Sequence, residues 1–317
     1  MAQIKQSKRG YLYIAAATFF WGLSATLGRA AFTGRLRFHG VAIGLVDPLI
    51  LSQSRVTFSF VAFLLFLLPR RGRRLLQVTG AGLGRMALLG VLGIAAANYF
   101  YYLAIQKTSV ATAIIVQYTA PVWVLLYLSA RGLQKPTIRR IAAVAMSVTG
   151  IAIVIGVVGP SGHLNPIGII AALLAAFACA FYNISGHSIM KTYDHWTILF
   201  YMTLAASLFW LLPNPPWKII AAHYSPAQWL FLALFAAVSM LIPFSFYFAG
   251  LQHIEPTSAI VTSCLEPVFS ILIAALVLNE KLRPSQAVGV IIVLAAVVLL
   301  QWPEARSEKL DVLEPLN

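Results

Sequence analysis

Charged residues are scarce in this sequence. Asp, Glu, Lys and Arg make up 10% of its 317 residues, and hydrophobic residues make up 60%, whereas an average soluble domain has about 25% charged residues. So few charges cannot cover the surface of a soluble protein of this length. The composition therefore predicts an all-α membrane protein that crosses the lipid bilayer many times, with helices of about 20 apolar residues.

Cysteine is scarce as well, and two common functional motifs are absent. The two cysteines, Cys179 and Cys264, both fall in apolar stretches, which excludes a disulfide framework and favours a role as small apolar side chains. The sequence contains neither a phosphate-binding GxxxxGK[ST] loop nor an HExxH motif. We therefore expect no ATP-driven transport by this chain alone, and we expect no cofactor and no metal ion.

Apolar stretches long enough to cross a membrane recur along the whole chain. At about 20 residues per spanning helix, they divide the sequence into ten predicted spans. The approximate bounds of these spans are 11–32, 47–68, 83–105, 109–130, 137–158, 166–187, 196–212, 226–250, 256–278 and 284–302. The connection 33–46 is the longest on its side of the membrane, and the sequence does not predict its role.

Basic residues outnumber acidic ones by 23 to 9, which gives a net charge of +14. In a soluble protein this excess would suggest a nucleic-acid partner, but in a membrane protein the placement of the charges matters more. Twelve basic residues lie in three groups: Lys5, Lys8 and Arg9; Arg70, Arg71, Arg73, Arg74 and Arg85; Arg131, Lys135, Arg139 and Arg140. With ten spans, all three groups lie on the side that the positive-inside rule assigns to the cytoplasm. We expect both termini to be cytoplasmic, in a bacterial inner membrane, and no nucleic acid to be bound.

One acidic residue, Glu266, lies in the middle of an apolar span. Inserting such a carboxylate costs roughly 2.5 to 3.5 kcal/mol, so we expect it to face a cavity or a partner. Thr262, Ser263 and Ser270 lie on the same helix face. Two interpretations stay open: Glu266 has a functional role, or it joins helices by accepting hydrogen bonds. Arg55, near the outer end of the second span, is expected to extend to the membrane interface.

Polar and aromatic residues share helix faces in several other spans. They are Trp21 and Ser24, Asn98 and Tyr102, Gln117 and Tyr118, Asn183, and Tyr247. Three prolines inside spans, Pro121, Pro243 and Pro267, each remove a backbone hydrogen bond, so we predict helix kinks there. Kinked, polar-lined helices are common around solute paths, although the same residues could equally serve helix packing.

The two halves of the chain show an internal duplication. A shift of 146 residues lays 101–123 over 247–269 without a gap, with six identities in 23 positions. Asp47 corresponds to Asp194 at a shift of 147. Upstream of the connection 33–46, Phe19 corresponds to Phe177 and Gly28 to Gly186 at a shift of 158, and the length of this connection explains the larger shift. Such self-similarity predicts two copies of one structural unit.

We therefore predict two five-helix units, residues 1–160 and 161–303, followed by a cytoplasmic tail at 304–317. Because five is an odd number, the second unit enters the membrane from the opposite side, which makes the repeat inverted. Inverted repeats are common in secondary transporters, whose site lies near the membrane midplane between the units. In the duplication Glu266 corresponds to Ala120, so the charge is present on one side only.

Several short motifs occur at defined places in this architecture. They are Trp21-Gly22, Arg55 at the start of the second span, Pro121-Val122, Glu266-Pro267-Val268 and Asn279-Glu280-Lys281-Leu282. With the ten spans, they make nearly the whole chain resemble an EamA-type carrier of the drug/metabolite transporter superfamily. The resemblance implies an exporter of amino acids or other small metabolites, with a cavity between spans 1, 3, 4, 6, 8 and 9. The first repeat ends in Ser129-Ala130-Arg131-Gly132 where the family often has Gly-Glu, which leaves the subfamily and the substrate open.

We combine these patterns into one predicted site and function. The predicted substrate-binding residues are Trp21, Ser24, Asn98, Tyr102, Gln117, Tyr118, Asn183, Tyr247, Ser263 and Glu266. The predicted function is secondary transport of small organic metabolites across the membrane by alternating access, carried out by a monomer. Aromatic walls with few charges suit amphipathic solutes.

The energy source of transport stays open. Transport could be coupled to proton exchange through Glu266, or it could be facilitated flux.

The class of protein has one alternative, an intramembrane enzyme acting on a lipid-linked substrate. Such an enzyme would need an acid/base pair or a metal cluster, which the predicted spans do not supply.

Overall fold

The structure, a computed structural model, describes residues 2–32, 37–38, 41–42, 46–107, 113, 116–155, 165–278 and 284–301. Two short antiparallel strands, β1 (Arg37–Phe38) and β2 (Val41–Ala42), form a hairpin. The other described elements are the helices α1 (Ala2–Phe32), α2 (Pro48–Leu76), α3 (Gly80–Leu88), η1 (Leu89–Ala95), α4 (Ala96–Lys107), α6 (Ala120–Ala130), α7 (Ile138–Ile155), α8 (Pro166–Ile189), α9 (His195–Trp210), α10 (Pro216–Ala221), α11 (Pro226–Ala236), η2 (Ala237–Leu241), α12 (Ile242–Leu251), α13 (Pro256–Ser263), α14 (Leu265–Leu278) and α15 (Pro284–Gln301).

Helices occupy every predicted span in the described part of the chain. Among these residues, five helical stretches are long and apolar enough to cross a membrane, namely 8–28, 49–72, 80–101, 166–189 and 226–251, and two shorter apolar helices cover 120–130 and 287–300. The prediction of an all-helical membrane protein is therefore confirmed. The start of the fourth predicted span at residues 109–112 and the predicted tail 304–317 lie outside the described residues.

Two details of the helices differ from the predicted spans. Helix α2 continues to Leu76, beyond the predicted end of the span at residue 68, because the arginines that end the apolar stretch still support a helix. Helix α10 was not predicted, because six residues are too few to give a recognisable apolar period. Neither difference changes the order of the spans.

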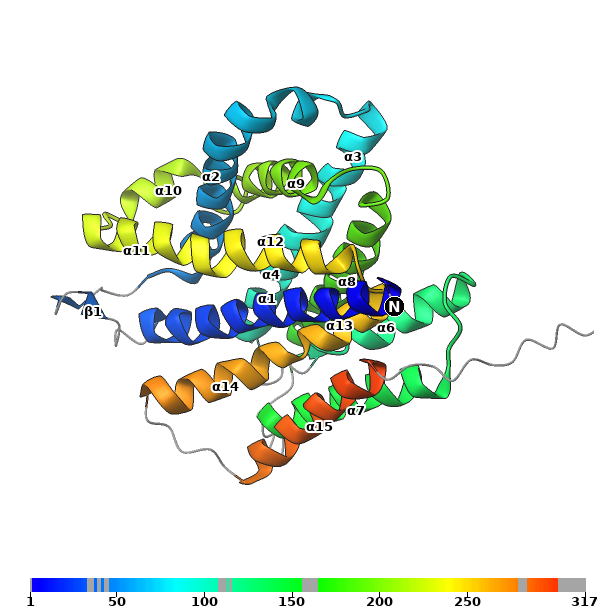
Figure 1. The fold of residues 1–317 in the computed structure, drawn as a ribbon. Helices are drawn as coiled ribbons and strands as arrows, with labels where there is room; N and C mark the ends of the chain where they lie inside the picture. The colour runs from blue at the N-terminus through cyan, green and yellow to red at the C-terminus, as the bar shows by residue number, and fades with distance from the viewer. Residues whose placement is uncertain are drawn as a thin grey trace, which may run out of the picture.

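Helix α1 lies at the centre of one group of helices and α8 at the centre of another. In Figure 1, α1 runs between α12 and α14, and it contacts both along much of its length. Helix α8 contacts α4, η1 and α6, while α2 pairs with α9 and α7 pairs with α15. Glycine allows α1 and α12 to cross closely, since a Cβ on Gly250 would lie 2.9 Å from the carbonyl oxygen of Gly10.

The duplicated positions also share their capping geometry. Asp47 accepts hydrogen bonds from the backbone of Leu49 at 2.8 Å and of Ile50 at 3.1 Å, at the start of α2. Asp194 accepts from Trp196 at 3.0 Å and from Thr197 at 3.2 Å, at the start of α9. Each carboxylate thereby satisfies the first free N–H groups of its helix.

The N-caps of the next helices match as well, at a shift of 146. Thr79 caps α3 by accepting from the backbone of Gly82 at 3.1 Å, and Ser225 caps α11 by accepting from Gln228 at 3.3 Å. Both caps have extended backbone dihedrals, which aim the hydroxyl at the free N–H groups. Equivalent sequence positions therefore start equivalent helices in both halves.

We predict that Asp194→Ala destabilises the protein by about 1 kcal/mol, because the N–H groups at the start of α9 lose their partner. Asp194→Asn should cost less, since its amide oxygen still accepts these hydrogen bonds. The measurement is thermal unfolding of the purified protein in detergent. Equal losses for both variants would mean that the charge, which also contacts Arg71 at 3.5 Å, matters more than the cap.

Candidate functional site

The helices that surround the predicted site have irregular backbones at matching positions. The π-helix η1 interrupts the third predicted span and η2 interrupts the eighth, and a shift of 146 lays residues 91–95 on η2. π-Helices are rare and frequently occur at functional sites. The duplication therefore extends to an unusual backbone feature in both halves.

A second pair of irregularities interrupts the fourth and ninth predicted spans. A turn at Tyr118-Thr119 precedes α6, and a single turn residue, Cys264, separates α13 from α14. Pro121 and Pro267 fall in the first turns of α6 and α14, where the missing N–H of proline is not needed. Pro243 likewise begins α12, directly after η2. The structure therefore places each of the three prolines just after a break in regular α-helix.

Glu266 lies in the first turn of α14, where the free N–H groups and the helix dipole favour a carboxylate. Of the groups around this carboxylate, the Tyr118 hydroxyl and the Arg55 guanidinium lie close enough to interact with it electrostatically. All three side chains retain intermediate solvent accessibility. The structure thus brings together groups from α2, from the turn before α6 and from α14.

The side chain of Arg55 does not lie where the sequence predicted. Its Nη2 donates a hydrogen bond to the backbone carbonyl of Ser239, in η2, at 3.0 Å. We expected this side chain to extend to the membrane interface, and that expectation is wrong, because the π-helical segment offers a carbonyl within its reach. Arg55 is therefore the site residue that the prediction missed, although its position inside an apolar span was a usable signal.

An aromatic cluster formed by α1, α8 and α12 contains three of the predicted residues. The Trp21 ring centroid lies 5.3 Å from that of Tyr247, and Tyr182 lies 5.8 Å from Tyr247. The fully buried Asn183 donates a hydrogen bond from Nδ2 to the Tyr247 hydroxyl. Among the described residues, no partner is present for the Asn183 Oδ1 atom. Trp21, Asn183 and Tyr247 therefore form one contiguous group.

Three other predicted residues donate to backbone carbonyls three or four positions earlier in the chain. Ser24 donates to the carbonyl of Trp21 at 2.9 Å, Ser263 to that of Ile260 at 2.7 Å, and Asn98 to that of Ile94 at 2.7 Å. For Ser263 the local reason is clear, because the break at Cys264 leaves carbonyls of α13 without helical partners. The structure therefore gives each of these side chains a bond to the backbone.

The last two predicted residues come from the third and fourth spans. Gln117 donates a hydrogen bond from Nε2 to the Cys179 sulfur, in α8, at 3.3 Å. The side chain of Tyr102 lies outside the described residues. Both cysteines are free thiols, as predicted.

Helix α1 contacts both α12, which carries Tyr247, and α14, which carries Glu266. Trp21 faces α12, whereas a Cβ on the next residue, Gly22, would lie 3.0 Å from the carbonyl oxygen of Glu266 and 2.8 Å from the Cβ of Phe269. Only glycine permits this approach of α1 to α14. A movement of α1 would therefore change the surroundings of both groups.

The chain is similar over most of its length to several known proteins. The chain is 22% identical over 308 residues to an uncharacterized inner membrane transporter, YicL, of Salmonella typhimurium, covering 96% of this chain and 98% of that protein. It is 24% identical over 278 residues to an uncharacterized transporter of Archaeoglobus fulgidus, covering 84% and 92%. It is 27% identical over 233 residues to the protein PecM of Dickeya dadantii, covering 69% and 74%.

A solved crystal structure has the same fold. It superimposes with a TM-score of 0.74 at 16% identity, and the match covers 92% of this chain and 96% of the other. The profile of the EamA-like transporter family matches twice, at residues 8–156 and 166–302. The chain therefore belongs to the EamA-like transporter family and is a membrane transporter.

Proposed function

We propose that the protein is a secondary transporter of small organic metabolites that works by alternating access between two inverted five-helix units. The observation that carries the proposal is the carboxylate of Glu266, which lies inside the helix bundle near Tyr118 and Arg55 in a member of a transporter family. A carboxylate at this depth is costly unless it has a function or a firm structural partner. Its partial accessibility favours contact with a solute or with protons.

The contacts at the helix ends support an inverted arrangement of the units. Arg71, in the last turns of α2, lies 3.5 Å from Asp194, which caps the start of α9. At the other end of α2, Asp47 donates its backbone N–H to the Tyr224 hydroxyl, which precedes α11, at 2.8 Å. Helix α9 therefore starts where α2 ends. The two corresponding helices run in opposite directions, as an inverted repeat requires.

The side chains near Glu266 indicate the chemical class of the substrate. Aromatic rings are contributed by Trp21, Tyr118, Tyr182 and Tyr247, and the charged groups are Glu266 and Arg55. Such a mixture suits an amphipathic solute with an amino group that Glu266 can bind, such as a neutral amino acid. We propose export of solutes of this class from the cytoplasm of a bacterium, with both termini on the cytoplasmic side of the inner membrane.

Counterflow in proteoliposomes tests this proposal. Vesicles loaded with unlabelled leucine or phenylalanine should accumulate the same radiolabelled amino acid faster than protein-free vesicles, and the uptake should saturate. Vesicles loaded with glucose serve as the control and should not do so. Absence of flux for every neutral amino acid and its analogues would contradict the substrate class. Conversion of a lipid-linked substrate without any solute flux would favour an enzyme instead.

A further inference from the structure

A network of polar residues joins the two predicted units at one end of the bundle. We call it the basic end, because Arg71, Arg85 and Arg140 all make their contacts there. The N-terminus lies at this end, and the β-hairpin lies at the opposite one (Figure 1). The turn between α6 and α7 meets the turn between α12 and α13 at the basic end, and α13 contacts both α6 and α7.

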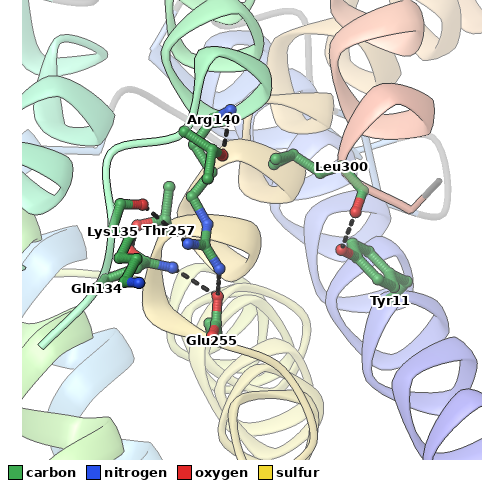
Figure 2. A network of polar contacts seen from close by, with 8 residues as sticks. Tyr11, Gln134, Lys135, Arg140, Glu255, Thr257 and Leu300 are labelled. Atoms are coloured by element: carbon green, nitrogen blue, oxygen red, sulfur yellow. Dashed lines mark hydrogen bonds and ion pairs between the residues drawn. The ribbon is translucent and has the colours of Figure 1, made fainter. Parts of the chain in front are cut away.

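Figure 2 shows how the side chains of these turns interlock around one carboxylate. Glu255 Oε2 lies 2.6 Å from Arg140 Nη2 and accepts a hydrogen bond from Gln134 Nε2 at 2.5 Å. Thr257 Oγ1 in turn donates to Gln134 Oε1 at 2.5 Å. Arg140 Nη1 is held in place by the carbonyl of Lys135 at 2.9 Å. The ion pair and the hydrogen bonds that Glu255 and Thr257 form here all join the second predicted unit to the first.

The burial of these groups makes their separation costly. Thr257 is 0% exposed and Gln134 is 8% exposed, so both would lose hydrogen bonds that buried polar groups require. The Arg140 side chain is 14% exposed, whereas that of Glu255 is 55% exposed. Water therefore reaches the ion pair from one side, through a polar pocket of about 190 Å³ that Glu255 shares with His253.

The duplication does not supply an equivalent ion pair at the opposite end. By the shift of 146, Glu255 corresponds to Ser109. When the helix starts are aligned on Pro136 and Pro284, Arg140 corresponds to Val288. Serine and valine cannot form an ion pair. The duplicated positions therefore do not repeat this ion pair, although the helices that carry them are duplicated.

We propose that Gln134, Arg140, Glu255 and Thr257 form a lock that keeps the basic end closed and biases the resting transporter toward the state that opens at the other end. The inference rests on the alternating-access function proposed above, in which the α6–α7 turn and the start of α13 must part when the basic end opens. Closing the basic end forms the lock. Opening it breaks one ion pair and two further hydrogen bonds.

Distance measurement between two spin labels tests the lock without any substrate. Leu133 is 69% exposed and Gln252 is also exposed, so cysteines at these positions can be labelled in a protein whose Cys179 and Cys264 are replaced by alanine. The unmodified lock should give one dominant short distance. In Glu255→Gln and in Arg140→Gln the population at a longer distance should rise about five-fold or more, as expected when a coupling between two states is lost.

Arg71→Gln is the matched control, because it removes an ion pair at the same end whose closest atoms are 3.5 Å apart and whose side chains are 36% and 40% exposed. It should leave the distances unchanged, since its atoms are farther apart than the 2.6 Å of the lock and neither of its side chains is as buried as Arg140. Unchanged distances in both lock variants, or an equal shift in Arg71→Gln, would overturn the proposal. Thr257→Val tests the buried hydrogen bond separately and should shift the distances in the same direction as Glu255→Gln.

Salt gives an independent readout on the same labelled protein. Raising the salt from 0.1 M to 1 M shortens the Debye length from about 10 Å to about 3 Å, so the longer distance should gain population in the protein with the intact lock. In Glu255→Gln the distances should not respond to salt, and an equal response in both proteins would contradict the lock. If counterflow fails while the distances behave as expected, the substrate class is wrong and the lock stands.

Discussion

Glu266→Gln is expected to reduce solute transport in proteoliposomes by about ten- to one-hundred-fold, the range that corresponds to the loss of one hydrogen bond to a charged group. The substitution keeps the size of the side chain and its ability to accept from Tyr118, but it removes the charge that Arg55 attracts. The experiment separates two roles. If Glu266 only couples transport to protons, exchange of solute should persist and accumulation driven by a proton gradient should vanish. If Glu266 binds the substrate, both should fall.

A hydroxyl far from the site provides the control for Glu266→Gln. Thr203 is fully buried in α9 and donates to the carbonyls of Leu199 at 2.7 Å and of Phe200 at 3.1 Å in its own helix. Thr203→Val has nearly the same shape and should leave transport unchanged. Transport and proton coupling that stay intact in Glu266→Gln would show that the carboxylate only joins helices.

Gly22→Ala is expected to destabilise the protein by about 1–3 kcal/mol, as overpacking of a tight contact does, and to lower transport. The added Cβ would lie 2.8 Å from both the Cβ of Phe269 and the backbone nitrogen of Ser270. These atoms cannot move aside by a side-chain rotation. Helices α1 and α14 must separate instead, which displaces Glu266 from its partners.

Thermal unfolding in detergent and counterflow measure the two effects of Gly22→Ala. The matched control is Gly84→Ala in α3, where an added Cβ meets nothing within 4 Å. That change should be neutral or should stabilise the helix by up to about 1 kcal/mol, because alanine favours helix more than glycine does. If the two substitutions have the same effect, the close contact of α1 with α14 is not important for the site.

The spans were predictable because each one depends on local composition. A helix in a bilayer satisfies its backbone groups internally and needs an apolar exterior, so the apolar stretches located most helices to within a few residues, although α1 begins at Ala2 instead of residue 11. The end of α2 at Leu76 was missed, because the helix continues into water after its apolar stretch has ended.

The duplication was predictable for a similar reason. The correspondence of Asp47 with Asp194 reflects the same local need, a carboxylate that satisfies the free N–H groups at a helix start. The contact of Arg55 was not predictable, because its partner is the carbonyl of Ser239, far along the chain. Distant pairs of this kind depend on which helices pack together.

By itself, the sequence determined that this protein is a helical membrane protein, that its halves are duplicated and that Glu266 is the acid inside the ninth predicted span. These three conclusions follow from hydrophobicity and from repetition, both of which are visible in the order of residues along the chain. Only the tertiary structure decided which side chains meet: Tyr118 and Arg55 with Glu266, and Arg140 with Glu255. The physical reason is that an ion pair or a hydrogen bond between remote segments exists only once helix packing has brought their backbones within a few ångströms.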